Sequence, residues 1–486
     1  MNLGDVLGGG SDADALIDLS AREAGALGRS YSFTELDAAV QNVAARMSFE
    51  NGAHCGLLAA NSASFVATWF ALMRRGAIAV PINTKFPDAT VAYITQDASL
   101  TSVYVDAEHA AKLPTTVQAM GLPPLQTGER FVSHAPAHGE LGMVLYTSGS
   151  TGRPKGVLLS HDSQWAMVAP MAKTLAGLCG IVAAPLYHMN GQLFLMALLA
   201  GRGKVVLMPK FDARRYLQAI AEHKVNVLTG VPTMLTLMLK EHDLMESLDL
   251  SSVIAIQVGS APLSETLIDQ VQARFPNARI SNGYGTTEAG ALMFGAHPDG
   301  IPVPSLALGY PQRHVKVRLV GGSDNEGVLE VLTPAAMNGY LNLPEKTAEK
   351  MTRDGWISTG DLMRRDEHGF FYFVGRDDDM FNCGGENIFP GEVERILESD
   401  PRIAECCVVP VADEIKGHKP VAFVVLAQGA RVNEAELKAV VLSQAPAYMH
   451  PRSVYFLEVM PLAGTNKIDR KVLAALAAES AAADGH

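Results

Sequence analysis

The fold of this chain is decided by the stretch Tyr146-Thr147-Ser148-Gly149-Ser150-Thr151-Gly152-Arg153-Pro154-Lys155-Gly156-Val157. Its glycines let the backbone approach an anion closely and adopt positive φ. Successive backbone N–H groups in such a loop form a concave anion-binding nest, to which the hydroxyl side chains add donors and Lys155 adds positive charge. Residues 143–146 and 157–159 on either side are apolar. The stretch therefore predicts a strand, a phosphate-binding loop, and then a second strand or the start of a helix.

The spacing differs from that of a Walker A loop, in which Gly-Lys is followed directly by Ser or Thr. Here Lys155 follows Arg-Pro and precedes Gly156. A flexible Gly/Ser linker is the alternative, but a linker does not usually hold Pro-Lys-Gly between two hydrophobic runs. The stretch resembles the phosphate loop of the adenylate-forming superfamily, which comprises acyl-CoA synthetases, peptide-synthetase adenylation domains and luciferases.

The composition is that of a globular protein. The chain has 486 residues, enough for about two to four domains. Its 48% hydrophobic and 19% charged residues exclude disorder. The net charge of −12 argues against nucleic acid as a partner but leaves room for local basic pockets that bind nucleotides.

Other features favour the cytoplasm. The five cysteines show no CxxC or Cys/His spacing, which argues against structural zinc and suits a reducing compartment. Residues 1–15 contain no basic residue, unlike a signal peptide. The most apolar region, 175–199, is interrupted by Pro185, His188 and Asn190, which argues against a membrane span.

Short β-branched runs alternate with amphipathic stretches along the chain. Strands are expected at 204–208, 225–228 and 253–258, and helices at 213–223 and 233–241. This alternation predicts α/β layers with largely parallel sheets. Residues 315–332 alternate in the manner of an antiparallel hairpin, and we expect it to turn at Gly321-Gly322.

We expect a domain boundary near residues 375–379. Residues 1–377 would form a large N-terminal AMP-binding domain, built of layered α/β subdomains and a β-barrel-like subdomain, that holds ATP and the acyl pocket. Residues 378–486 would form a small, mobile α+β domain. Its strands are expected at 407–411, 421–426 and 454–459.

A second motif, Ser281-Asn282-Gly283-Tyr284-Gly285-Thr286-Thr287-Glu288, follows an apolar run. The resemblance implies that Tyr284 stacks on adenine, that Thr287 lies near the α-phosphate and that Glu288 binds Mg²⁺. A cation that bridges phosphates needs only one or two carboxylates, which suits a single Glu. Alone, the motif could be a plain turn with a solvated Glu. Beside the phosphate loop, the functional interpretation is favoured.

Further motifs complete the nucleotide site by the same resemblance. Asp361, in Ser358-Thr359-Gly360-Asp361, would accept hydrogen bonds from the ribose diol, and Arg376 would contact the same hydroxyls or the phosphate. The full set of predicted nucleotide ligands is Thr147, Ser148, Gly149, Ser150, Thr151, Gly152, Lys155, Gly259, Ser260, Ala261, Asn282, Gly283, Tyr284, Gly285, Thr286, Thr287, Asp361, Arg376 and Lys467.

Lys467, in Pro461-Leu462-Ala463-Gly464-Thr465-Asn466-Lys467-Ile468-Asp469-Arg470, matches the lysine that enters the site during adenylation. Asn466 stands where the family usually has Gly. Asn tolerates positive φ better than most residues, so the departure is expected to be mild. An ordinary surface lysine is the alternative. We predict catalytic roles for Lys467, His188, Thr287 and Glu288.

The segment after the boundary resembles the hinge and following loop of 4-chlorobenzoate–CoA ligase and 4-coumarate–CoA ligase relatives. The resemblance places the hinge at Asp378 and lines the pantetheine tunnel with Gly384 and Gly385 after domain rotation. Lys416 would contact the CoA phosphates, although an ordinary surface lysine is the alternative. His188 would lie beside the carboxylate and the path of the thiol. The predicted acyl pocket comprises His188, Met189, Asn190, Val231, Gly259, Gly285, Gly290 and Ala291.

The resemblance implies an ATP-dependent carboxylic acid–CoA ligase that acts through an acyl-adenylate. The predicted pocket is mostly apolar and lacks an Arg for a second carboxylate, which favours an aromatic acid of the benzoate or hydroxycinnamate type. The alternatives are a medium-chain fatty acid–CoA ligase and an adenylating enzyme that loads a carrier protein. We expect ATP, Mg²⁺ and coenzyme A as cofactors and a small carboxylic acid as the further partner. A homodimer is one assembly that the chain could adopt.

Overall fold

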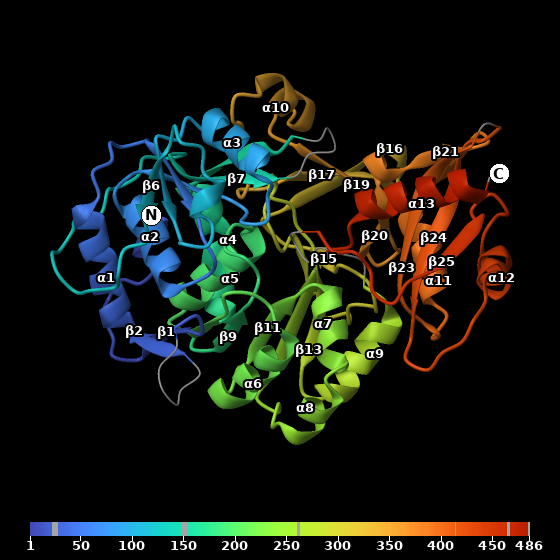
Figure 1. The fold of residues 1–486 in the computed structure, drawn as a ribbon, viewed down its shortest axis with the longest axis horizontal. Helices are drawn as coiled ribbons and strands as arrows, with labels where there is room; N and C mark the ends of the chain where they lie inside the picture. Colours follow the sequence, from blue (N-terminus) through green and yellow to red (C-terminus); the bar gives the residue numbers. More distant parts are fainter. Residues whose placement is uncertain (22–27, 148–152, 260–262, 414, 464–466, 485–486) are drawn as a thin grey trace.

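The computed structural model describes residues 1–21, 28–147, 153–259, 263–413, 415–463 and 467–484. In these ranges the chain forms two seven-stranded sheets, a four-stranded antiparallel sheet, a two-stranded sheet and a five-stranded sheet near the C-terminus. Figure 1 shows the C-terminal strands, with helices α11 to α13, gathered on one side of the molecule. The α/β class and the division into a large and a small unit are confirmed.

One seven-stranded sheet has the order β13-β12-β11-β9-β10-β1-β2. Its neighbours are parallel except β1 and β2. The strands are β1 Asp14–Asp18, β2 Arg29–Ser32, β9 Cys179–Val182, β10 Lys204–Leu207, β11 Val227–Gly230, β12 Ala255–Gly259 and β13 Arg279–Gly283. The predicted parallel pairing is confirmed. Because parallel strands end at the same edge, Gly259 and Gly283 lie directly opposite one another.

The other seven-stranded sheet has the order β18-β8-β7-β4-β3-β5-β6. Its strands are β3 His54–Leu58, β4 Ile78–Pro81, β5 Ser102–Val105, β6 Gln118–Gly121, β7 Leu141–Thr147, β8 Lys155–Ser160 and β18 Gly339–Tyr340. Strands β7 and β8 pair antiparallel on either side of the predicted phosphate loop, which confirms the strand before it and the strand after it. Residues 148–152 of that loop lie outside the described residues.

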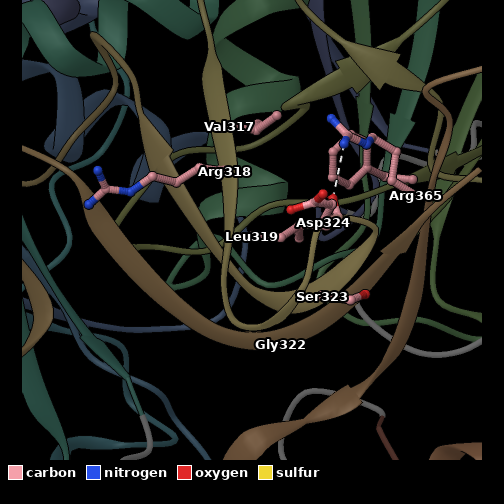
Figure 2. Close-up of a pocket in the computed structure, with 8 residues that line it drawn as sticks. Val317, Arg318, Leu319, Gly322, Ser323, Asp324 and Arg365 are labelled. Carbon is pink, nitrogen blue, oxygen red and sulfur yellow. Dashed lines mark hydrogen bonds between the residues drawn. The ribbon is translucent and has the colours of Figure 1, made fainter.

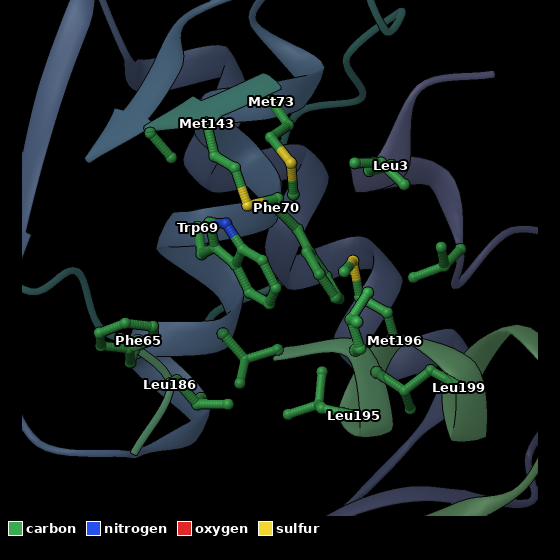
Figure 3. Packing of buried hydrophobic residues seen from close by; sticks show 14 of the residues in the cluster. Leu3, Phe65, Trp69, Phe70, Met73, Met143, Leu186, Leu195, Met196 and Leu199 are labelled. Atoms are coloured by element: carbon green, nitrogen blue, oxygen red, sulfur yellow. The ribbon is translucent and has the colours of Figure 1, made fainter. Parts of the chain in front are cut away.

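Two apolar helices, α2 and α5, fill the space between these sheets. Figure 3 shows Trp69 and Phe70 of α2 beside Leu195 and Met196 of α5, with Met143 of β7 above them. A helix that is apolar on all sides is one buried on all sides.

The helices are α1 Phe33–Arg46, α2 Ala63–Arg74, α3 Asp88–Asp97, α4 His161–Thr174, α5 Met189–Ala200, α6 Ala213–His223, α7 Pro232–Leu239, α8 His242–Ser247, α9 Glu265–Arg274, α10 Pro344–Lys350, α11 Pro390–Glu398, α12 Glu434–Gln444 and α13 Arg470–Asp484. Within the described ranges, none of them has the length and apolar character that crossing a membrane requires.

The antiparallel sheet has the order β16-β17-β19-β20. Its strands are β16 Lys316–Ser323, β17 Glu326–Leu332, β19 Ile357–Arg365 and β20 Phe371–Arg376, and β14 Phe294–Gly295 pairs nearby with β15 Tyr310–Pro311. The hairpin at 315–332 is confirmed, but the turn predicted at Gly321-Gly322 is wrong. Those glycines lie in β16 where the register shifts, and Ser323 pairs with Glu326, so the turn lies at Asp324-Asn325. A bulge and a turn both favour glycine, which is why the pattern misled.

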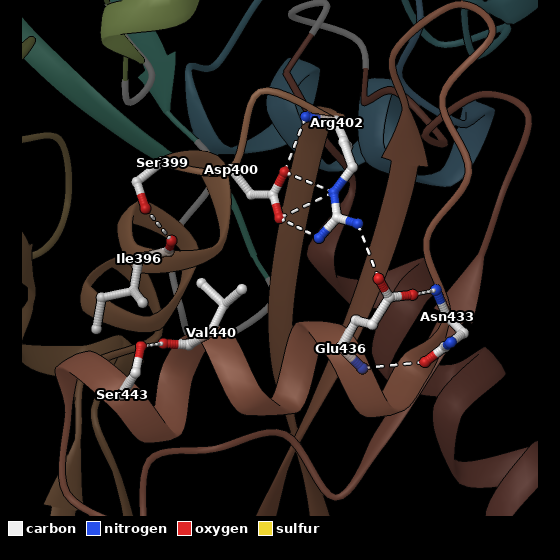
Figure 4. A network of polar contacts seen from close by, with 8 residues as sticks. All are labelled: Ile396, Ser399, Asp400, Arg402, Asn433, Glu436, Val440 and Ser443. Carbon is white, nitrogen blue, oxygen red and sulfur yellow. Dashed lines mark hydrogen bonds and ion pairs between the residues drawn. The ribbon is translucent and has the colours of Figure 1, made fainter.

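The C-terminal sheet consists of β21 Phe381–Cys383, β22 Glu386–Ile388, β23 Ile403–Asp413, β24 Gly417–Leu426 and β25 Ser453–Phe456. Alternate residues of β23 face opposite sides, so Cys406 packs toward α11 and α12 whereas Cys407 packs toward α13. On the α12 side, Arg402 bridges Asp400 at 2.7 Å and Glu436 at 2.9 Å (Figure 4). Glu436 also completes a capping box with Asn433 at the start of α12.

Candidate functional site

The antiparallel sheet places a buried carboxylate at the end of β13. Asp361 of β19 pairs in register with Arg376 of β20, and their side chains form an ion pair of 3.1 Å. The Tyr284 hydroxyl donates a hydrogen bond to Asp361. Burial, and next the charge of Asp361, raise the pKa of Tyr284 well above its ordinary value. The structure thus brings together three residues that were predicted to hold the nucleoside.

A second cluster joins the phosphate loop to the Glu288 segment. Glu288 accepts a hydrogen bond of 2.8 Å from the Tyr340 hydroxyl. The Lys155 Nζ lies 4.7 Å from the centre of the Tyr340 ring, within the range of a cation–π contact. Thr147 pairs with Lys155 across the β7–β8 hairpin. Lys155 and Glu288, the two charged residues predicted at the phosphate site, therefore both contact Tyr340. Lys155 contacts its ring and Glu288 its hydroxyl.

The segment that carries Thr286, Thr287 and Glu288 is a tight backbone turn. Thr286 and Gly290 exchange two backbone hydrogen bonds of 2.9 Å, and the Thr286 Oγ1 accepts from the Ala289 N–H at 3.0 Å. A Cβ at Gly285 would lie 2.4 Å from the Ala291 Cα. Only glycine allows this close approach of the two backbone segments.

The remaining predicted acyl-pocket residues lie at strand and helix ends nearby. His188 precedes α5, Met189 and Asn190 begin it, and Val231 precedes α7. A Cβ at Gly259 would lie 2.6 Å from the Gly283 carbonyl oxygen, so the ends of β12 and β13 need small residues here. Asn282 donates to the Leu306 carbonyl at 3.2 Å. Ser260 and Ala261 lie outside the described residues.

His188 is held neutral in the folded protein. Burial, and next the positive charges of Lys467 and Lys85, lower the pKa of His188 to about 4. Its Nε2 atom is buried and has no hydrogen-bond partner among the described residues. A buried polar atom of this kind favours a bound partner, because burial without a hydrogen bond is costly.

Lys467 of the C-terminal unit reaches the same place. The positive charge of Lys467 lowers the pKa of His188. The charges of Arg376 and Asp361 in turn affect the pKa of Lys467. Burial, and next the charge of Arg376, lower the pKa of Lys467, whereas Asp361 opposes that shift. A lysine distant in sequence therefore interacts electrostatically with the carboxylate of the first cluster and with the predicted acyl-pocket histidine.

The segment that carries Lys467 is anchored from both sides. The Ala463 N–H donates to the Lys467 carbonyl and the Asp469 N–H to the Pro461 carbonyl, both at 2.7 Å. Arg470 then forms an ion pair of 2.7 Å with Glu394, whose side chain is 4% exposed. Removing one partner of such a buried pair is strongly destabilising, so this contact fixes the end of the segment.

The predicted CoA-binding residues lie together on an exposed surface. Gly384 and Gly385 form the turn between β21 and β22, with φ values of 64° and 95°. The Gly384 N–H donates to the Lys416 carbonyl at 2.9 Å. All three residues are exposed, whereas Lys467 is half-buried. The predicted hinge residue, Asp378, lies in the short 3-10 helix η3 Asp377–Asp379 between β20 and β21.

A hollow of about 420 Å³ lies beside the antiparallel sheet (Figure 2). Arg318, Asp324 and Arg365 are among the residues that line it, and Arg365 donates to the Asp324 carbonyl at 3.0 Å. None of the predicted site residues lines this hollow. It is therefore separate from the clusters around Asp361 and Glu288.

Sequence reasoning missed two residues of the site, Tyr340 and Lys350. Tyr340 is placed by the pairing of β18 with β8, and Lys350 ends α10. Burial, and next the charge of Glu288, raise the pKa of Tyr340. The Gly339-Tyr340 dipeptide before a Pro-initiated helix was the available signal for Tyr340, whereas Lys350 is one of several charged residues in α10.

Acidification should destabilise the protein through His188. Since the pKa of His188 is lowered from 6.5 to about 4, the unfolded chain binds the proton first as the pH falls. The free energy of unfolding should therefore be unaffected above pH 6.5 and decrease between pH 6.5 and 4, with about 2 kcal/mol lost by pH 5. Urea unfolding of the wild type and of His188→Gln at pH 7 and pH 5 measures this. The variant should lose about 2 kcal/mol less, and equal losses would show that His188 is not held neutral.

Two family models match this chain. A family model described as AMP-binding enzyme matches residues 8–341, and one described as AMP-binding enzyme C-terminal domain matches residues 392–467. The chain is 34% identical over 355 residues to 4-coumarate–CoA ligase 1 of Solanum tuberosum, a match that covers 68% of this chain and 64% of that protein. It is 33% identical over 434 residues to feruloyl-CoA synthase of Amycolatopsis sp, covering 86% of this chain and 87% of that protein.

Solved structures show the same architecture. The crystal structure of ATP-bound MatB from Rhodopseudomonas palustris matches with a TM-score of 0.86 and 27% sequence identity, covering 98% of each chain. The first family model alone spans more than half of the chain. This chain therefore belongs to the AMP-binding enzyme family, within the adenylate-forming superfamily that its motifs resemble.

Proposed function

We propose that this chain is an AMP-forming ligase that joins an aromatic carboxylic acid of the benzoate or hydroxycinnamate type to coenzyme A. The observation that carries the proposal is that Lys467 interacts electrostatically with the Asp361–Arg376 pair and with His188. A cation there can neutralise a carboxylate and a phosphate at once. The aromatic class is supported by the names of the two curated relatives, and by the apolar, buried side chains of Met189 and Val231.

In the first step, a carboxylate oxygen of the acid attacks the α-phosphorus of ATP, and the bond to pyrophosphate breaks. Such a transfer depends mainly on positioning and charge neutralisation. We assign the ribose to Asp361 and Arg376, and adenine to Tyr284. Lys155 and Thr147 with the loop 148–152 would hold the phosphates, with Thr287 near the α-phosphate. Lys467 would stabilise the negative charge that develops between the two reactants.

Mg²⁺ is proposed to assist this step at Glu288. A cation that takes most of its ligands from phosphates and water needs one or two protein carboxylates, so a single Glu288 fits. The Tyr340 hydroxyl, at 2.8 Å, orients that carboxylate. When bound, the ion would neutralise charge on the phosphates.

In the second step, the CoA sulfur attacks the acyl carbon and the bond to AMP breaks. Neutral His188 can accept a hydrogen bond at Nε2, where the path of the thiol is proposed. Gly384, Gly385 and Lys416 would bind CoA, but they are exposed while Lys467 is at the site. We therefore propose that residues 378–486 move as a unit about Asp378 between the steps.

The location and the assembly are also proposed. All five cysteines are buried and free of disulfides, which suits the cytoplasm predicted from the sequence. A homodimer is proposed as the assembly, and sedimentation would test it.

The first experiment measures AMP release with ATP, Mg²⁺ and CoA across benzoates, cinnamates, and short- to medium-chain fatty acids. We expect AMP release that requires CoA and is fastest with one class of ring acid. A preference for fatty acids would overturn the substrate class. AMP or pyrophosphate released equally without CoA would overturn the acceptor and indicate a carrier protein.

A further inference from the structure

Helix α10 presents one polar face to the site and another to solvent. Thr347 and Lys350 share the inward face: Thr347 Oγ1 accepts from the Tyr340 N–H at 2.9 Å, and Lys350 Nζ donates to the Thr359 carbonyl at 2.8 Å. Lys346 and Glu349 pair with each other at 2.7 Å on the exposed face. Lys350 is thus the lysine of this helix that turns inward, and the contact with β18 holds the helix in that orientation.

Charged groups of both clusters of the site interact with the ammonium group of Lys350. Glu288 and Asp361 attract it, and Arg376 and Lys155 repel it. A Cβ at Gly360 would lie 3.7 Å from the Lys350 Nζ and 3.6 Å from Arg376 Nη2, so the two cations flank the same backbone. Burial is the main reason why the pKa of Lys350 is lowered. A cation at this position would interact with the part of a bound nucleotide that joins the ribose, proposed at Asp361, to the phosphates proposed at Glu288.

Lys350 also has hydrogen-bonding capacity to offer a ligand. An ammonium group carries three donors, and the Thr359 carbonyl takes one of them. Among the described residues, no carboxylate oxygen lies within ion-pair distance of Lys350. A partly buried ammonium group without a carboxylate partner is stabilised when an anion binds beside it.

We propose that Lys350 is a further nucleotide ligand, which binds the α-phosphate of ATP and of the acyl-adenylate. In a nucleotide held at Asp361 and Glu288, the α-phosphate is the anionic group between the ribose and the metal-bound phosphates. The inference rests on the proposed function. Because Lys350 and β19 precede the proposed hinge, Lys350 would remain on the adenylate in both steps, whereas Lys467 would leave after the first.

Isothermal titration with adenosine, AMP and ATP plus Mg²⁺ tests this in Lys350→Met. The matched control is Lys346→Met, on the exposed face of the same helix. The loss of a charged hydrogen bond should weaken AMP and ATP binding by about tenfold or more and leave adenosine binding unchanged. The control should bind all three as the wild type does. Thioester formation from supplied acyl-AMP should show a KM for the adenylate raised by about the same factor.

Other results would overturn the proposal. Equal weakening of adenosine binding would mean that Lys350 acts only by holding the Thr359 carbonyl. Weakening confined to ATP would assign it to the terminal phosphates. If Lys350→Met fails to fold, Lys350→Gln keeps a donor for the Thr359 carbonyl and removes only the charge, and the same pattern is expected. These binding measurements need neither acid nor CoA, so they stand apart from a failure of the proposed ligase activity.

Discussion

Lys467→Ala should slow acyl-adenylate formation by about 10²- to 10³-fold and leave thioester formation from supplied acyl-AMP close to the wild-type rate. The reason is that the Lys467 ammonium group interacts electrostatically with Asp361, Arg376 and His188. Negative charge concentrates there as the carboxylate approaches the α-phosphate. Lys467 is proposed to withdraw before CoA attacks, so the second step should not need it.

Two assays separate the steps. Pyrophosphate exchange reports adenylation, and CoA-dependent consumption of prepared acyl-AMP reports thioester formation. Lys471→Ala is the matched control, because Lys471 lies four residues on and is exposed. It should behave as the wild type in both assays. An equal loss of both activities in Lys467→Ala would contradict the assignment and indicate a structural role.

Asp378→Pro should block the overall reaction while sparing adenylation. Asp378 lies in η3, which joins β20 of the antiparallel sheet to β21 of the C-terminal sheet. Proline fixes φ near −65° and removes the N–H, so the linker loses the freedom to adopt a second conformation. Gly384, Gly385 and Lys416 would then stay exposed to solvent. We expect thioester production to fall by on the order of tenfold or more, with pyrophosphate exchange near the wild-type rate.

Asp378→Ala is the control for this prediction, since it removes the same carboxylate but leaves the backbone free. It should retain most of the overall rate. An unchanged overall rate in Asp378→Pro would refute a hinge at this position. Loss of pyrophosphate exchange as well would show that the proline disturbs the arrangement in which Lys467 is at the site.

Short-range features could be predicted from the sequence because their causes are local. The glycines and flanking apolar runs of residues 143–159 specify a strand, a loop and a strand. The alternation at 315–332 specifies two paired strands wherever the turn between them lies, which is why its strands were right and its turn was wrong. Helix α6 begins at an Asp212 cap and spans the predicted 213–223. Motif resemblance also named Asp361, Arg376 and Tyr284, which the structure brings into contact.

Residues whose role depends on a distant partner could not be found in this way. Tyr340 contacts Glu288 because a two-residue strand pairs with β8, and a two-residue strand leaves no periodic pattern. Lys350 differs from Lys346 only in the face of α10 that it occupies relative to Thr359. Arg470 is one charge among several near the C-terminus, and only packing shows that it pairs with buried Glu394.

The sequence by itself determined the family, several of the strands and helices, and the residue types that carry the chemistry, because propensity and motif spacing act over a few residues. The tertiary structure decided which charges meet. The contact of Lys155 with the Tyr340 ring joins segments far apart in the chain, and the charges of Lys467 and Lys350 interact with His188 and Glu288, which are also distant from them in sequence. Their energies depend on distance and burial, and these are set only when the two large sheets, the antiparallel sheet and the C-terminal unit pack together.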